Sequence, residues 1–373
     1  MASLADIIFY LVLFASSAGL IYVGEKHRSK TLTALGLLAP VVYAAVRLNV
    51  GVDYVNYTNI ASDLSEITLP EFLTSGYAII YEHSVYYITQ LARLFPVWQI
   101  IFFGVYSLIT ILPFYFAMRK VNPKYTWLAI LFYLLMFFAP SLNGMRQFAA
   151  ISIIFYATIS YIYSNRVNLA KVCYFLALIL AATFLHSSAI CGVMVLPIVW
   201  LAKALAKKPA GRIIFYSLLA MGAVILLELF VVQNIEHIPF LNRYAHYLTW
   251  EKDGAPMPNL IPRLFPLFVG GWMLLKRELK NERVVIYYAL TAVALVLTFL
   301  GFLVPYGYRM SDYFLVFQIP LFIEAVTHAK TTTGQQKFYL KIFIAYAIVY
   351  FLYSSALNNS HLLFPYQFIF WPW

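Results

Sequence analysis

Long apolar segments, separated by short clusters of basic residues, run through the whole of this chain of 373 residues. Most are roughly 16 to 22 residues long, close to the roughly 20 residues with which an α-helix crosses the hydrocarbon core of a bilayer. Of all residues, 63% are hydrophobic and only 11% are charged, a composition that a soluble domain does not have. The sequence therefore predicts an all-α, polytopic integral membrane protein.

The distribution of charge excludes one function class. The net charge of +11 does not indicate nucleic-acid binding, because the basic residues are scattered between apolar runs, as in proteins whose charges set membrane orientation. The first apolar run, Asp6 to Val23, lacks the preceding basic region and the following cleavage pattern of a signal peptide, so we expect it to remain as a span. Cys173 and Cys191 lie in separate apolar runs, and we expect buried structural thiols.

The basic clusters also predict the topology. Lys26, Arg28 and Lys30 follow the first run, and the positive-inside rule places them in the cytoplasm and the N-terminus outside. The same reasoning along the chain gives about 12 spans with both termini outside and most of the 26 Lys and Arg residues in inner loops. The predicted spans are residues 6–23, 31–46, 97–118, 125–139, 146–164, 169–185, 187–205, 213–232, 260–275, 284–304, 309–327 and 338–357.

Two external loops follow from this topology, residues 47–96 and 233–259, within a single transmembrane domain of residues 1–373. The segment from Gly76 to Phe95 is apolar enough to cross but contains Glu82, His83 and Gln90. If it crossed, the basic cluster after the next span would lie outside, so we expect an external amphipathic or re-entrant helix.

Polar residues gather where the second predicted span meets the outer face, from Arg47 to Tyr57. Ionisable groups at such a boundary predict a functional site, although an arginine that ends a span often only extends to the lipid headgroups. Gly51, two residues before Asp53, indicates a tight turn that presents the carboxylate.

Three further spans are predicted to begin at the outer face with Arg146, His186 and Arg309. The positive ends of their helix dipoles, two guanidiniums and an imidazole would together suit a phosphate or pyrophosphate group. Simpler roles stay open: Arg309 can pair with Asp312 one turn later, His186 can cap a helix, and Arg263 can anchor a span at the interface.

Read as a series, these short motifs follow a family pattern. They are Arg-x-x-x-Gly-x-Asp-Tyr-x-x-Tyr (Arg47 to Tyr57), Tyr-Glu-His (Tyr81 to His83), Met-Arg-Gln (Met145 to Gln147), Leu-His-Ser-Ser (Leu185 to Ser188), Tyr-Arg (Tyr308, Arg309) and Pro-Tyr-Gln (Pro365 to Gln367). Over nearly its whole length the chain resembles the EpsG family of Wzy-like polysaccharide polymerases.

The resemblance implies a multi-pass enzyme of the bacterial inner membrane with its active site at the periplasmic face. It would join O-antigen or exopolysaccharide repeat units carried on undecaprenyl pyrophosphate, with one lipid-linked oligosaccharide as donor and another as acceptor. A chain-length regulator protein is a further expected partner. The expected architecture is GT-C-like, with an outward-facing cavity open to the bilayer.

The chemistry assigns roles to the outer residues. Undecaprenyl pyrophosphate is a good leaving group, so the transfer needs stabilisation of its charge and a base near the acceptor hydroxyl; we expect no nucleotide site, cofactor or metal. Arg146 and Arg309 are predicted to hold the pyrophosphate, with Arg47 shared between it and Asp53. Asp53 is the preferred base and His186 the alternative, while Glu82 would bind acceptor hydroxyls or support the base. Weaker candidates for glycan binding are Tyr54, Tyr57, Gln147, Tyr308 and Tyr366.

Two other functions remain as alternatives. A flippase or transporter of lipid-linked oligosaccharides could share the span count and the arginines, but transporters place their binding groups near the bilayer midplane and often contain repeats, and we find no repeat here. An O-antigen ligase would need the same pyrophosphate clamp, and the order of the motifs favours a polymerase.

Overall fold

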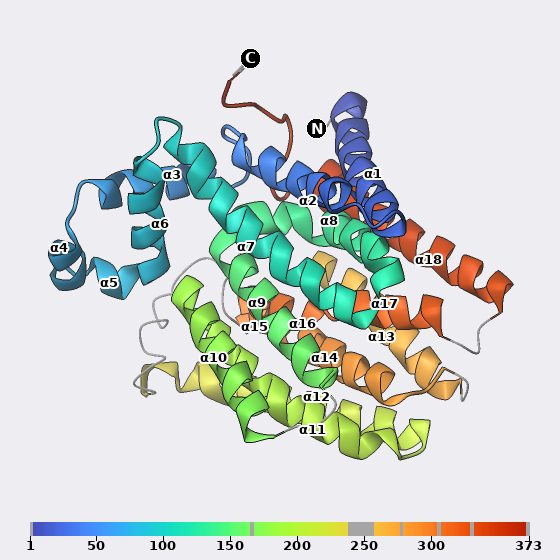
Figure 1. Ribbon diagram of the computed structural model, residues 1–373. Helices are drawn as coiled ribbons and strands as arrows, with labels where there is room; N and C mark the ends of the chain where they lie inside the picture. The colour runs from blue at the N-terminus through green and yellow to red at the C-terminus, as the bar shows by residue number, and fades with distance from the viewer. Residues whose placement is uncertain are drawn as a thin grey trace. The chain divides into compact units, whose positions relative to one another are not determined.

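The computed structural model describes residues 3–164, 168–237, 257–276, 279–303, 307–328 and 332–370, and helices dominate this part of the chain (Figure 1). The described residues contain no β-strand beyond an isolated antiparallel bridge between Arg47 and Phe368. The prediction of an all-α protein is confirmed. The contacts divide the chain into two compact units, Met1–Ile190 with Ile342–Trp373, and Cys191–Lys341.

Long helices form the body of the first unit. They are α1 (Leu4–Lys26), α2 (Lys30–Ala45), α7 (Trp98–Val121), α8 (Thr126–Asn143), α9 (Met145–Ile162) and α10 (Leu169–Leu185). Helix α7 packs against α9 and α2, α1 packs against α2 and α8, and α9 also packs against α10. Helix α8 lies deepest, because nearly all of its side chains are buried. Its Phe138 meets Phe14 of α1 edge to face, with ring centroids 5.3 Å apart, the geometry that aromatic pairs prefer.

A group of short helices lies beside one end of α7 in the same unit (Figure 1). These are α3 (Tyr54–Ser65), α4 (Leu69–Thr74), α5 (Tyr77–Ile80) and α6 (His83–Arg93). Helix α6 packs on α3, α7 and α10. With 11 residues it is about 17 Å long, too short to cross a bilayer core of about 30 Å. Its helical bounds fit the predicted amphipathic segment, and the external position of that segment stays a prediction.

The second unit is organised around α14 (Glu282–Thr298), whose side chains are almost all buried. Its other elements are α11 (Val195–Ala206), α12 (Ala210–Gln233), α13 (Met257–Leu275), α15 (Leu300–Leu303), α16 (Asp312–Leu315), α17 (Gln318–Thr327) and the first turns of α18 (Thr333–Phe351). Helices α11, α12, α13 and α17 all contact α14. Asn281 starts α14 by accepting a hydrogen bond from the backbone N–H of Val284 at 2.9 Å, as N-cap residues do.

Within the described residues, 8 helical segments are long and apolar enough to cross a membrane. They are Leu4–Lys26, Trp98–Val121, Pro123–Asn143, Met145–Ile162, Ser187–Ala206, Ala210–Gln233, Gly307–Thr327 and Thr333–Leu357. The other four predicted spans correspond to the helices α2, α10, α13 and α14, which are not among these 8 segments. The protein is therefore a polytopic membrane protein, and its total of about 12 spans stays a prediction.

Two predicted helix starts differ from the structure. After His186 the chain forms a 3-10 helix, Ser187–Met194, before α11 begins, and Arg309 lies in a second 3-10 helix, η5 (Gly307–Ser311). Ser311 donates its hydroxyl to the carbonyl of Tyr308 at 2.6 Å, and such side-chain bonds compete with a regular α-helix. Of the three predicted helix N-termini, the one at Arg146 belongs to a regular α-helix.

Candidate functional site

The loop from Arg47 to Asp53 connects α2 to α3 and is held by the C-terminal segment. The backbone N–H of Leu48 donates to the carbonyl of Gln367 at 2.8 Å, and that of Gly51 donates to the carbonyl of Leu362 at 3.0 Å. With the bridge between Arg47 and Phe368, these bonds tie together residues far apart in the sequence. The Pro-Tyr-Gln motif thus contributes backbone contacts to this loop.

Gly51 is the tightest point of the loop. Its φ of +100° lies in the region that favours glycine. A Cβ atom there would stand 2.7 Å from Oδ1 of Asn143, closer than a van der Waals contact allows. The predicted turn before Asp53 is confirmed, and no other residue fits at its centre without a shift of Asn143.

Arg47 is buried under aromatic rings and has 1% of its surface exposed. Its guanidinium carbon lies 4.5 Å from the ring centroid of Phe103 and 5.8 Å from that of Tyr54, so cation–π attraction replaces part of its lost hydration. Burial lowers the pKa of Arg47 to about 10, and the group stays cationic at neutral pH. Its Nε and Nη1 atoms make no hydrogen bond.

Asp53 stands at the start of α3, partly exposed. Among the described residues it forms no ion pair, either with Arg47 or with another cation. Its backbone carbonyl accepts a hydrogen bond from the N–H of Tyr57 at 2.9 Å, so the two side chains lie one helical turn apart on the same face. The carboxylate is therefore open to a ligand that approaches this end of α3.

Arg146 lies against Tyr57, the residue that follows Asp53 by one helical turn. Its guanidinium carbon is 5.5 Å from the Tyr57 ring centroid, and Nη1 forms an ion pair with Oε2 of Glu82. The Arg146 side chain is 18% exposed, whereas Arg47 is fully buried. Its Nε is buried without a hydrogen-bond partner.

Glu82 joins three parts of the chain. It precedes α6 in extended conformation, and its Oε1 accepts hydrogen bonds from the backbone N–H of Ser187 at 3.1 Å and from its hydroxyl at 3.4 Å. Burial raises the pKa of Glu82, but the charges of Arg146 and His186 and the Ser187 N–H outweigh it, so the net pKa is lowered. Glu82 is therefore ionised near neutral pH.

His186 lies between α10 and the Ser187 turn, and Ser188 sets its tautomer. The backbone N–H of Ser188 lies 3.3 Å from Nδ1 of His186, and the Ser188 hydroxyl lies 2.7 Å from the same atom. A backbone N–H can only donate, so Nδ1 accepts and the neutral ring carries its proton on Nε2. In this state His186 is a hydrogen-bond donor on its other side, which suits a phosphate oxygen better than the proton of a sugar hydroxyl.

The remaining predicted residues are distributed differently. Tyr54 stacks on Phe103 and is buried, and Gln147 is also buried. Tyr366 stacks on Tyr43, with centroids 3.9 Å apart, and donates its hydroxyl to the Tyr43 carbonyl. Tyr308 and Arg309 belong to the second unit, and their convergence with Arg146 stays a prediction.

The family model described as the EpsG family matches residues 30–368, which includes every motif residue named above. The chain belongs to the EpsG family. EpsG proteins are Wzy-like polymerases, so membership indicates a polymerase-like, glycosyltransferase-like function in the synthesis of surface polysaccharide. No curated protein and no solved structure matches the chain.

Several contacts of this EpsG chain were not predicted from its sequence. Asn143 lies against Gly51 and Phe103 against Arg47, and Ser188 contacts His186 within the Leu-His-Ser-Ser motif itself. The polar Ser-Leu-Asn-Gly stretch at the end of an apolar helix was a signal for Asn143. Arg263 is buried and pairs with Asp312 at 3.3 Å, so its predicted role as an interfacial anchor is wrong. The buried thiol predicted at Cys173 is also wrong, because this side chain is exposed on α10.

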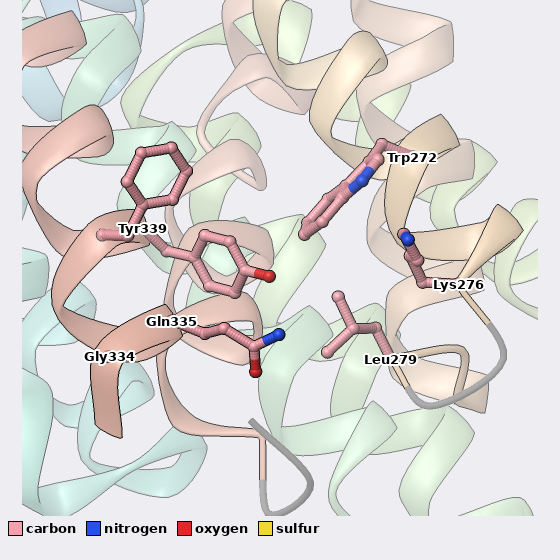
Figure 2. A pocket seen from close by; sticks show the side chains of 7 residues that line it. Trp272, Lys276, Leu279, Gly334, Gln335 and Tyr339 are labelled. Carbon is pink, nitrogen blue, oxygen red and sulfur yellow. The ribbon is translucent and has the colours of Figure 1, made fainter. Parts of the chain in front are cut away.

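A cavity of about 450 Å³ lies in the second unit, lined by residues between Trp272 and Tyr339. Figure 2 shows Trp272 on α13, and Lys276 directly after that helix, facing Gln335 and Tyr339 on α18 across it. None of the predicted site residues lines it. Among the described residues, no group of three His, Cys, Asp or Glu side chains could hold a metal ion.

Proposed function

We propose that this EpsG-family protein is an O-antigen or exopolysaccharide polymerase of the bacterial inner membrane. It would transfer a glycan from undecaprenyl pyrophosphate to a sugar hydroxyl of a second lipid-linked repeat unit at the periplasmic face. The observation that carries this proposal is the partly exposed side chain of Arg146 at the start of α9, whose guanidinium lies against Tyr57 one helical turn after Asp53.

In the proposed reaction, the acceptor hydroxyl oxygen attacks the anomeric carbon of the donor glycan. The new glycosidic bond forms as the bond between that carbon and the pyrophosphate oxygen breaks, and undecaprenyl pyrophosphate leaves with the bonding electrons. Arg146 and the Nε2–H of His186 stabilise the developing negative charge, as paired donors do for phosphate groups. Asp53 accepts the proton of the hydroxyl, because it is ionisable, partly exposed and without an ion pair among the described residues.

The proposed topology explains how two lipid-linked substrates could meet. With about 12 spans and both termini outside, residues 47–96 lie in the periplasm and place Asp53 and Glu82 at the outer end of the bundle. The undecaprenyl chains can then stay in the bilayer while their headgroups meet above it. Arg309 is also proposed to bind the pyrophosphate, and Arg47 to support the loop.

Complementation of a strain that lacks its polymerase tests the function. Wild type should restore the ladder of polymer lengths on a gel, whereas Arg146→Ala should reduce it to single repeat units. Losing such a donor typically lowers the rate about 100-fold or more. Arg93→Ala is the matched control, because Arg93 follows the same external segment but stacks on Trp98, 3.9 Å from its ring centroid. It should keep the ladder at equal protein level.

Other results would contradict the proposal. If loss of the protein removes even the single capped unit, export or ligation is the function and the assigned roles are wrong. If Arg146→Ala and Arg93→Ala behave alike, Arg146 has no special part in the reaction.

A further inference from the structure

The carboxylate of Glu82 forms an ion pair with Arg146, the cation that the proposed donor must bind. Arg146 is the partly exposed arginine beside Tyr57 on which the proposed reaction depends, and Oε2 of Glu82 already binds its Nη1. A carboxylate and a phosphate recognise the same donor edges of a guanidinium. The two anions therefore compete for Arg146.

The carboxylate of Glu82 keeps other hydrogen-bond partners when it loses Arg146. Its second oxygen, Oε1, is held independently by the backbone N–H and hydroxyl of Ser187. If Oε2 leaves Arg146, the carboxylate keeps these two hydrogen bonds. Release of Arg146 thus does not leave a buried charge without partners, which would be strongly unfavourable.

Arg146 has a hydrogen-bond donor that its ion pair with Glu82 does not satisfy. Its Nε is buried and unpaired even though Nη1 is occupied. A buried donor without a partner is costly, and a pyrophosphate, which has several acceptor oxygens, can satisfy Nε together with a terminal nitrogen. A single carboxylate oxygen on Nη1 leaves this donor unsatisfied.

We propose that Glu82 is a displaceable counter-ion: the donor pyrophosphate takes Arg146 from it, and the carboxylate remains on Ser187 beside His186. This inference rests on the proposed function and adds its regulation. Without a donor, Arg146 is neutralised and held in position. With a donor, the freed carboxylate keeps its hydrogen bonds to Ser187. After transfer, Glu82 competes for Arg146 again and promotes release of undecaprenyl pyrophosphate.

The exchange predicts opposite effects on binding and turnover. In Glu82→Gln the competing charge is gone, so undecaprenyl pyrophosphate should bind about 10-fold more tightly, the effect of losing one modest ion pair. Turnover should fall, because the product is released more slowly, so that KM and kcat decrease together. A purely structural Glu82 would give the reverse for binding, since loss of the ion pair would misplace Arg146.

Binding of undecaprenyl pyrophosphate to the full-length protein in lipid nanodiscs measures the first effect, and a gel-based assay of lipid-linked repeat units measures the second. Glu66→Gln is the matched control: it removes the same charge from an exposed position at the end of α3 and should change neither. Glu82→Asp keeps the charge but shortens its reach to Arg146, so it should also tighten binding, by less than Glu82→Gln. It gives an independent test if Glu82→Gln does not fold.

Each alternative outcome is decisive. Weaker binding in Glu82→Gln and in Glu82→Asp, or equally tighter binding in Glu66→Gln, overturns the proposal that Glu82 is a displaceable counter-ion. Absence of both binding and polymerisation in the wild type, with a folded protein, instead overturns the proposed function.

Discussion

Gly51 illustrates how one residue shapes the candidate site. Its positive φ, and the 2.7 Å that would separate a Cβ atom at this position from Asn143 Oδ1, together exclude a side chain. We expect Gly51→Ala to destabilise the protein by about 2 kcal/mol or more, because a non-glycine residue in this region costs about 1 to 2 kcal/mol before any clash. Thermal unfolding in detergent, monitored by circular dichroism, measures the loss.

Gly76→Ala is the matched control for Gly51→Ala. Gly76 also has a positive φ, but nothing lies within 4 Å of its Cβ position. The difference between the two variants therefore isolates the contact with Asn143. Equal losses would mean that Asn143 moves freely and that the loop tolerates a side chain.

At the scale of residues, the sequence predicted which polar side chains belong to the candidate site, but it did not predict which of them contact one another. Arg47, Asp53, Glu82, Arg146 and His186 could be selected because polar residues are rare in such a chain. The ion pair of Glu82 with Arg146 joins residues 64 positions apart, and the rings that cover Arg47 come from two helices. Such contacts depend on packing, which no local pattern encodes.

At the scale of elements, helix α6 is attached to the body of the first unit through Glu82. The pKa of Glu82 is lowered in the folded protein, so its ionised form stabilises the fold above the ordinary glutamate pKa of about 4.3. This contribution is lost as the pH falls through the lowered value. We expect the melting temperature to fall more steeply below about pH 4.5 in wild type than in Glu82→Gln.

Melting curves of the two proteins between neutral and acidic pH test this role. Parallel curves would mean that Glu82 contributes equally in both protonation states, and its ion pair would then not stabilise α6. Helix positions themselves were largely predictable, because long apolar runs alternate with short basic clusters along the chain. The 3-10 segments after His186 and around Arg309 were not, since they depend on hydroxyl contacts of neighbouring serines.

At the scale of the whole molecule, membrane orientation decides whether the site faces the periplasm. The positive-inside argument places Ser65 outside and Lys124 inside, provided that the segment from Gly76 to Phe95 does not cross. If that segment crossed, Lys124 would lie outside while Ser65 stayed where it is. These two positions therefore test the step on which the rest of the topology depends.

Single cysteines at Ser65 and Lys124, in a background with Cys173 and Cys191 replaced by serine and alanine, measure the orientation. Lys124 is exposed, in the turn before α8, and Ser65 ends α3. A membrane-impermeant maleimide added to cells with a permeabilised outer membrane should label Ser65→Cys at once. It should label Lys124→Cys only after the inner membrane is opened, because the bilayer excludes the charged reagent. Immediate labelling of both would mean that α5 and α6 belong to a crossing segment, and the periplasmic position of Arg146 would then have to be abandoned.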